Sequence, residues 1–191
     1  MDPPMDLLLS ICLGIGLSAA CGFRVFIPLL VMSAAAQGGY LHLDPGWSWL
    51  GSTAALWTFG TAAVLEAVAY FIPWLDHLLD SAAAPAAAVA GAVVMASSLA
   101  DVPPLVKWTM AVIAGSGSAA LVQGTTMLAR GVSTALTGGL GNPAVAAGEA
   151  GAAVLLSVLA VTLPVIAALA VAALAVYMIR KAFRGKRGQQ A

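Results

Sequence analysis

Five long apolar segments constrain this chain more than any other feature of its sequence. They cover residues 7–32, 50–75, 81–100, 105–128 and 150–179. Each holds at most one charged residue, and each is about 20 residues or longer, which lets a helix cross the roughly 30 Å hydrocarbon core of a bilayer. Backbone groups in that core must be satisfied within the segment, and the residues do not alternate as in a membrane barrel. The sequence therefore predicts an all-α polytopic membrane protein with about five transmembrane helices, in a single integral membrane domain over residues 1–191.

The composition leaves too few polar residues to cover a water-soluble domain. Hydrophobic residues make up 61% of the chain and charged residues 8%, whereas charged residues are about 25% of a typical soluble domain. Eight basic and eight acidic residues cancel, so we expect the lipid bilayer as a partner and no nucleic acid. Because no Ser/His/Asp set, phosphate loop or Cys/His cluster occurs, the sequence predicts no enzyme activity, no cofactor and no metal site.

Five of the eight basic residues lie at the end of the chain, in residues 180–191. Segments rich in Lys and Arg stay in the cytoplasm, so these residues are predicted to form a basic cytoplasmic tail. With five crossings, the N-terminus then lies outside. The third apolar segment, 81–100, decides this topology, because a segment that only dips into the bilayer would change the parity.

The two halves of the chain, residues 7–100 and 105–179, share a plan. Each has an apolar segment, then a Gly-Gly break with an Asx-Pro helix start, then an apolar segment with a late proline. The matching pairs are Gly38-Gly39 with Asp44-Pro45, and Gly138-Gly139 with Asn142-Pro143. Asx before proline is typical of a helix N-cap. Because three segments precede the second copy, we predict an inverted repeat, an arrangement common in transporters.

Two charges lie deep in the predicted membrane region. Arg24 is near the middle of segment 7–32 and Glu66 is near the middle of segment 50–75. An isolated charge at that depth costs about 2.5–3.5 kcal/mol, so two antiparallel helices would be expected to bring the two together. One hypothesis is a substrate or proton site; the other is a structural ion pair that fixes helix register.

More polar residues gather near the predicted outer ends of the helices. Asp76 and Asp80 follow the second segment, and Arg130 and Glu149 bound the second break. We expect these four residues to line an outer mouth that binds a cation or a charged head group. The alternative is that they are interfacial charges in water.

Asn142 completes the set of candidate binding residues. Residues 137–145 contain Asn142-Pro143-Ala144, which resembles the Asn-Pro-Ala loop of aquaporins. Aquaporins need two such loops, and the first half of this chain instead reads Asp44-Pro45-Gly46. A re-entrant break that uses the end of a helix is the more plausible interpretation.

Small residues recur at close helical spacing in two segments. Gly14, Ser18 and Gly22 lie four residues apart, and residues 115–118 read Gly-Ser-Gly-Ser. This spacing favours close packing of helices in a membrane. Local unwinding that exposes carbonyl groups to a substrate is the alternative for residues 115–118.

The run at residues 16–30, GLSAACGFRVFIPLL, resembles the opening of a bacterial integral-membrane family catalogued as domain of unknown function 4126. The second segment is similar as well, and the positions that carry the likeness are Leu65-Glu66, Ile72-Pro73, Asp76 and Leu78-Leu79-Asp80. Arg130 and Glu149 match more loosely, and Tyr70-Phe71 stand where relatives tend to carry a charged pair. The resemblance implies a location in the bacterial inner (plasma) membrane and implies no activity.

These observations favour a small transporter or channel for a small polar solute or ion. The candidate binding residues are Arg24, Glu66, Asp76, Asp80, Arg130, Asn142 and Glu149. A chain of 191 residues encloses little volume, so we expect a homodimer. A lipid- or partner-binding protein without transport activity is the alternative, and a membrane enzyme acting on a lipid is a weaker third.

Overall fold

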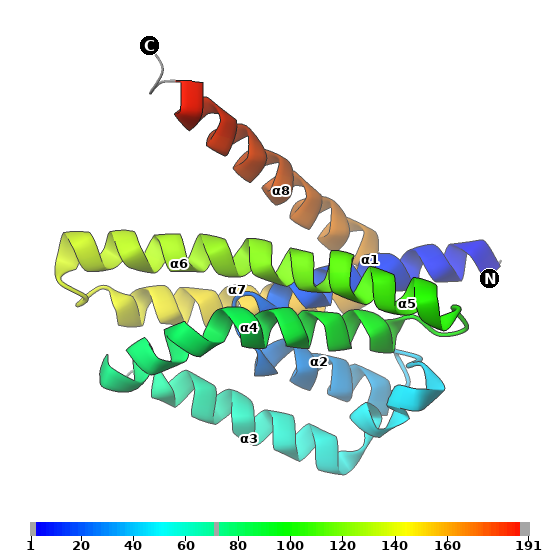
Figure 1. The fold of residues 1–191 in the computed structure, drawn as a ribbon. Coiled ribbons are helices and arrows are strands. Elements are labelled where there is room, and N and C mark those ends of the chain that lie inside the picture. Colours follow the sequence, from blue (N-terminus) through cyan, green and yellow to red (C-terminus); the bar gives the residue numbers. More distant parts are fainter. Residues whose placement is uncertain (1–2, 71–72, 188–191) are drawn as a thin grey trace.

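The computed structural model describes the backbone of residues 3–70 and 73–187 and the side chains of residues 5–70 and 81–181. Over this part of the chain every regular element is helical, which confirms the predicted all-α class. The elements are α1 Pro3–Cys21, α2 Phe26–Gln37, the 3₁₀ helix η1 Pro45–Gly51, α3 Thr53–Ala69, α4 Pro73–Ser98, α5 Pro104–Met110, the π-helical stretch η2 Ala111–Ser116, α6 Gly117–Thr137, α7 Asn142–Thr162 and α8 Pro164–Arg187 (Figure 1).

The predicted number of membrane-crossing helices is confirmed. Four stretches are long and apolar enough to cross a bilayer: Ser81–Ser98, Pro104–Thr137, Asn142–Thr162 and Pro164–Lys181. The fifth candidate is η1 with α3, a pair of helices bent by 62° that forms either one broken span or a re-entrant loop. Large side chains such as Leu65, Leu155 and Leu169 are mostly exposed on these helices, and lipid covers such a surface. The third predicted segment is thus long enough to cross fully.

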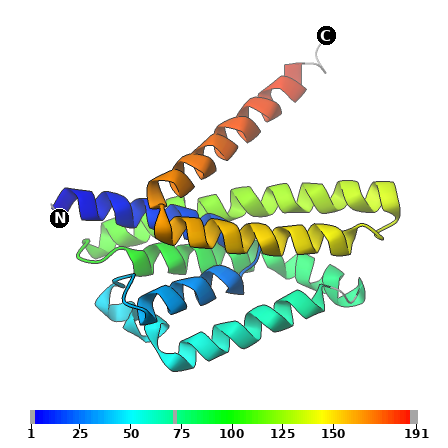
Figure 2. The ribbon, with the colours of Figure 1, turned by 180° about the vertical axis from the view of Figure 1, so that it is seen from behind.

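Segment 7–32 is not one span, so this part of the prediction was wrong. Helix α1 ends at Cys21, and after residues 22–25 helix α2 runs back beside it, as both views show (Figures 1 and 2). The turn is held by backbone bonds from Gly22 N–H to Ala19 O and from Phe23 N–H to Ala20 O. Hydropathy misses this reversal because the turn residues are themselves mostly apolar. We call α1 and α2 the N-terminal hairpin.

Segment 150–179 is also divided. Helix α7 ends at Thr162, Leu163 leaves the helical conformation with φ −137° and ψ 64°, and α8 begins at Pro164. Proline disfavours a helical conformation in the residue before it, which explains the break. Helix α8 then leaves the bundle at an oblique angle (Figure 1).

Helix α1 lies at the centre of the bundle and packs against α4, α6, α7 and α8. Small residues allow these close contacts, as the sequence predicted. A Cβ on Gly22 would lie 2.3 Å from the Ala119 carbonyl oxygen of α6, and Ser18 Oγ donates a 2.7 Å hydrogen bond to Gly91 O of α4. At residues 115–118 the structure shows close packing, because Gly115, in the π-helical stretch η2, lies directly against Gly91.

The two predicted breaks share their local geometry but follow different helices. Gly39, Gly138 and Gly139 all have positive φ, a conformation that glycine adopts without strain. Asp44 caps η1 by accepting from Gly46 N–H, whereas Asn142 is the first residue of α7 and caps nothing. The first break follows a hairpin and the second follows the long helix α5–η2–α6. The inverted repeat stays a prediction.

An ion pair connects the first break to helix α5. Lys107 Nζ donates to Asp44 Oδ2, and both side chains are 15% exposed. Asp44 N–H also donates to Ser97 O at 3.0 Å. The hydrogen bond from Lys107 holds the pKa of Asp44 below its ordinary value, so the folded state favours the carboxylate.

This pair predicts a pH-dependent stability. A carboxyl group with a lowered pKa stabilises the fold above its unfolded-state value of about 3.9, and the contribution disappears as the pH falls through the folded-state value. At neutral pH in detergent, Asp44→Asn is therefore expected to lower the Tm by about 1–3 °C. The difference should close in acid. A gap between wild type and variant that stays constant down to acidic pH would contradict the assignment, and Lys107→Gln should remove the effect of the Asp44 substitution.

Candidate functional site

Four charged side chains and one tyrosine converge where the tip of the N-terminal hairpin meets α3, α6 and α7. We call Arg24, Glu66, Tyr70, Arg130 and Glu149 the charged cluster. Arg24 lies in the turn of the hairpin, Glu66 is in α3, and Tyr70 directly follows α3. Arg130 is in α6 and Glu149 is in α7. The cluster therefore joins residues from both halves of the chain.

Arg24 is the most buried member, with 2% of its surface exposed. Its Nη2 atom donates to the Ala146 carbonyl of α7 at 2.9 Å and lies 3.4 Å from Glu149 Oε2. Its guanidinium carbon stands 3.6 Å from the centre of the Tyr70 ring, where the ring face attracts a cation. These contacts tie the hairpin tip to the first turns of α7.

Arg130 and Glu149 form a two-point ion pair, and each is 6% exposed. Arg130 Nε donates to Glu149 Oε1 at 3.0 Å, and Arg130 Nη2 donates to Glu149 Oε2. The guanidinium also lies 4.3 Å from the centre of the Tyr70 ring. Both arginines thus face one tyrosine ring and share one carboxylate oxygen, Glu149 Oε2.

Glu66 caps the N-terminus of α2. Its carboxylate oxygens accept from Val25 N–H at 3.0 Å and from Phe26 N–H at 3.2 Å. No side chain of α2's own N-terminal turn provides this bond. A carboxylate at a helix N-terminus satisfies free N–H groups and favours the helix dipole. Glu66 therefore replaces the water that these backbone groups cannot find inside a membrane.

The expected direct pairing of Arg24 with Glu66 is corrected by the structure. Arg24 pairs with Glu149, and Glu66 binds the backbone just beside Arg24. Both buried charges have a polar partner, as predicted, but they do not pair with each other: Arg24 contacts Glu149, and Glu66 accepts hydrogen bonds from backbone N–H groups. The Arg24–Glu66 pairing was predicted because the two residues lie in consecutive apolar segments. The Arg24–Glu149 pairing arises because α7 packs against the hairpin.

Arg130 and Glu149 were expected to line an outer mouth, and the structure places both in the charged cluster, where each is buried. Asn142 lies two helical turns away from Glu149 and exchanges hydrogen bonds with Thr134 on the exposed end of α6. Asp76 and Asp80 fall within α4, and their side chains lie outside the described residues. The sequence analysis did not identify Tyr70 as a member of the site. Its position one helical turn after Glu66 was the signal that could have placed it there.

Three polar atoms stand out as buried without a hydrogen-bond partner among the described side chains. They are Arg24 Nε, Arg24 Nη1 and Ser33 Oγ. Nε and Nη1 together carry three of the five N–H groups of a guanidinium. Buried polar groups are nearly always hydrogen-bonded, so an unsatisfied donor needs an explanation. Arg24 therefore presents unpaired donors inside the cluster.

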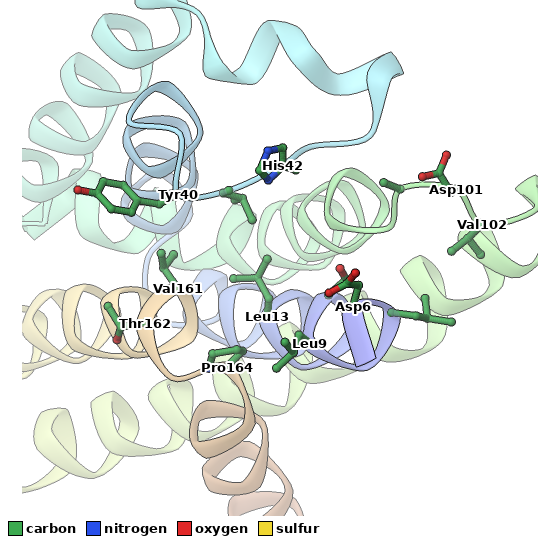
Figure 3. A pocket seen from close by; sticks show the side chains of 14 residues that line it. Asp6, Leu9, Leu13, Tyr40, His42, Asp101, Val102, Val161, Thr162 and Pro164 are labelled. Carbon is green, nitrogen blue, oxygen red and sulfur yellow. The ribbon is translucent and has the colours of Figure 1, made fainter. Parts of the chain in front are cut away.

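A cavity of about 1060 Å³ opens at the opposite end of the bundle (Figure 3). The first half of α1, with Asp6, Leu9 and Leu13, forms one wall, and the segment with Tyr40 and His42 faces it. The end of α7 and the turn after α4 complete the lining. No member of the charged cluster lines this cavity, because the cluster lies beyond the other end of α1.

A second hollow of about 650 Å³ lies on the flank between α2, α3 and α4. Its lining is almost entirely apolar and includes Trp47, Trp49, Phe59, Leu29 and Val89. We call it the lateral groove. Val25, the residue after Arg24, also lines it, so the groove reaches the neighbourhood of the charged cluster.

Comparison with known proteins places the chain in a family. The family described as "Domain of unknown function (DUF4126)" matches residues 11–184. No curated protein and no solved structure matches the chain. The matched region runs from the middle of α1 to the last turns of α8 and includes every member of the charged cluster. The protein is therefore a polytopic helical membrane protein that belongs to the DUF4126 family, as the motif around Arg24 indicated.

Proposed function

We propose that this protein moves a small polar solute or ion across the membrane and that the charged cluster is the central site of the pathway. The observation that carries the proposal is Arg24, which is almost fully buried at the tip of a helical hairpin and keeps two nitrogen atoms without an acceptor. Ionisable groups at membrane depth usually mark solute or ion pathways. A purely structural ion pair would be expected to satisfy its donors.

The arrangement of helices around the cluster supports the same proposal. Helices interrupted in the membrane, with their ends facing a buried polar site, are typical of transporters. The N-terminal hairpin has this form, and the free N–H groups of α2 meet Glu66 beside Arg24. The cavity at the far end of α1 does not reach the charged cluster, so the proposal requires another conformation that connects the two.

Flux through reconstituted protein tests the proposal. Purified protein in phosphatidylethanolamine–phosphatidylglycerol vesicles is assayed with chloride, formate, sodium and potassium as probes. We expect at least one probe to enter faster than in empty vesicles, and Glu66→Gln to lower that rate about tenfold or more, since a charge-assisted hydrogen bond to the α2 terminus is lost.

Asp44→Asn is the matched control, because it makes the same change from carboxylate to amide outside the cluster. It should leave the flux unchanged. A Glu66→Gln protein that is folded and transports as well as wild type would overturn the proposal, and so would the absence of flux for all four probes.

Lipid binding without transport is the second candidate, and the lateral groove is the observation that favours it. A groove of 650 Å³ lined by tryptophan and aliphatic side chains suits an acyl chain. In this case the vesicles would show no flux, and phospholipid would copurify with wild type but not with Ala86→Trp, a substitution that fills the groove.

A further inference from the structure

We infer that Arg24 binds a small monovalent anion of the formate type, and that the Glu149 carboxylate occupies this anion's place in the described conformation. This inference deepens the proposed function by naming the class of solute, and only its transport step rests on that function. The binding step rests on the unpaired donors of Arg24 and on the position of Glu149 between Arg24 and Arg130.

The unsatisfied atoms of the cluster define what the ligand must supply. Arg24 Nε and Nη1 are donors with no partner, and the side chain that carries them is 2% exposed. A guanidinium cannot lose its proton in a protein, so it can only be satisfied by acceptors. A cation has none to offer, whereas a carboxylate presents two oxygens in the planar geometry that a guanidinium fits.

The contact with Glu149 satisfies only part of the hydrogen-bonding capacity of Arg24. The same oxygen, Oε2, accepts a hydrogen bond from Arg130 and lies 3.4 Å from Arg24 Nη2, which is an ion-pair distance rather than a good hydrogen bond. The stronger contacts of Glu149 are with Arg130. Each free edge of the Arg24 guanidinium includes Nη2, the atom that faces Glu149. A free anion in the place of the Glu149 carboxylate can therefore accept from Nη2 and from Nε or Nη1, which have no acceptor in the described structure.

Burial limits the size of this ligand. Arg24, Arg130 and Glu149 are each less than a tenth exposed, and Gly22 beside them is in contact with the α6 backbone. Arg24 lines neither of the two cavities described above, so a phospholipid head group or a large metabolite has no room beside it. The ligand must be about as large as the carboxylate of Glu149 itself, which is the size of formate.

Chemical rescue tests the binding step. Glu149→Ala removes the internal carboxylate and leaves room for a free one. We expect about 100 mM sodium formate to raise the Tm of this variant in detergent by about 3–6 °C, as mass action predicts for binding in the millimolar range. Wild type, in which Glu149 holds the site, should gain less than a third of that shift. If Glu149→Ala does not fold, Glu149→Ser takes its place, because serine also leaves room for a free carboxylate.

Two controls separate binding at Arg24 from a general effect of salt. Gly22→Ala is destabilised for a steric reason and should not respond to formate. Glu149→Ala combined with Arg24→Met should lose most of the response, although Arg130 is still present. No formate-dependent shift in Glu149→Ala or Glu149→Ser, or an equal shift in Gly22→Ala, would overturn the inference.

Transport is measured separately, so the two proposals can fail independently. Formate rescue together with uptake of radiolabelled formate supports both. Rescue without uptake of any probe supports anion binding at Arg24 and contradicts the proposed transport. Uptake of sodium or potassium that depends on Glu66, without rescue, supports transport and overturns the anion.

Discussion

Glu149→Leu is expected to destabilise the protein by about 3–5 kcal/mol, the largest effect of any single substitution considered, because it leaves two buried guanidinium groups without their carboxylate. Arg130 loses both of its bonds to Glu149, and Arg24 loses its ion pair. Thermal unfolding in detergent, followed by tryptophan fluorescence, should show a Tm lowered by about 6 °C or more.

This loss of stability is expected to come from the unpaired charges of the two arginines and not from a change in side-chain volume. A second variant tests this explanation. When Arg24 and Arg130 are replaced by methionine together with Glu149→Leu, most of the lost stability should return, since an apolar cluster needs no partners. A Glu149→Leu protein with a wild-type Tm, or a triple variant no more stable than the single one, would show that the arginines do not depend on Glu149.

The second large effect is expected at Gly22, where the hairpin tip touches α6. An alanine Cβ at this position would lie 2.3 Å from Ala119 O and 2.9 Å from the backbone nitrogen of Gln123. Both atoms belong to the helix backbone, so no side-chain rotation relieves the clash. Gly22→Ala should therefore cost about 2 kcal/mol or more and lower the Tm by about 4–8 °C.

Gly124→Ala is the matched control, because it makes the same change in α6, at a position where a Cβ meets nothing within 4 Å. Removing a glycine from an open helical position gains up to about 1 kcal/mol. The two variants should thus shift the Tm in opposite directions. Equal stability of Gly22→Ala and Gly124→Ala would mean that the hairpin does not seat on α6.

Much of the fold could be predicted because hydropathy and helix-end chemistry are local. Apolar length predicted the crossing helices, and Asp44 followed by Pro45 predicted a capped helix start that the structure confirms. The same local reasoning failed at residues 22–25. Gly22, a buried charge and Pro28 in the first turn of α2 were the signal for a reversal, but the average hydropathy of the segment does not change there.

The candidate site was predicted in its parts and not in its assembly. Arg24, Glu66, Arg130 and Glu149 all attracted attention as charges in an apolar chain, and all four meet in the charged cluster. Their partners could not be assigned, because the contact from Arg24 to Ala146 joins residues 122 positions apart. No pattern along the sequence encodes which helices become neighbours over such a distance.

The sequence by itself determined that this chain forms apolar helices, where glycine and proline interrupt them, and which charges are too costly to leave alone in lipid. These properties depend on each residue and its near neighbours. Only the tertiary structure decided that α2 turns back beside α1, that Glu66 caps α2 from another helix, and that Glu149 forms ion pairs with two arginines. Those outcomes depend on side chains and backbones meeting across the bundle, where small residues let helices approach and where each buried donor must find the nearest acceptor.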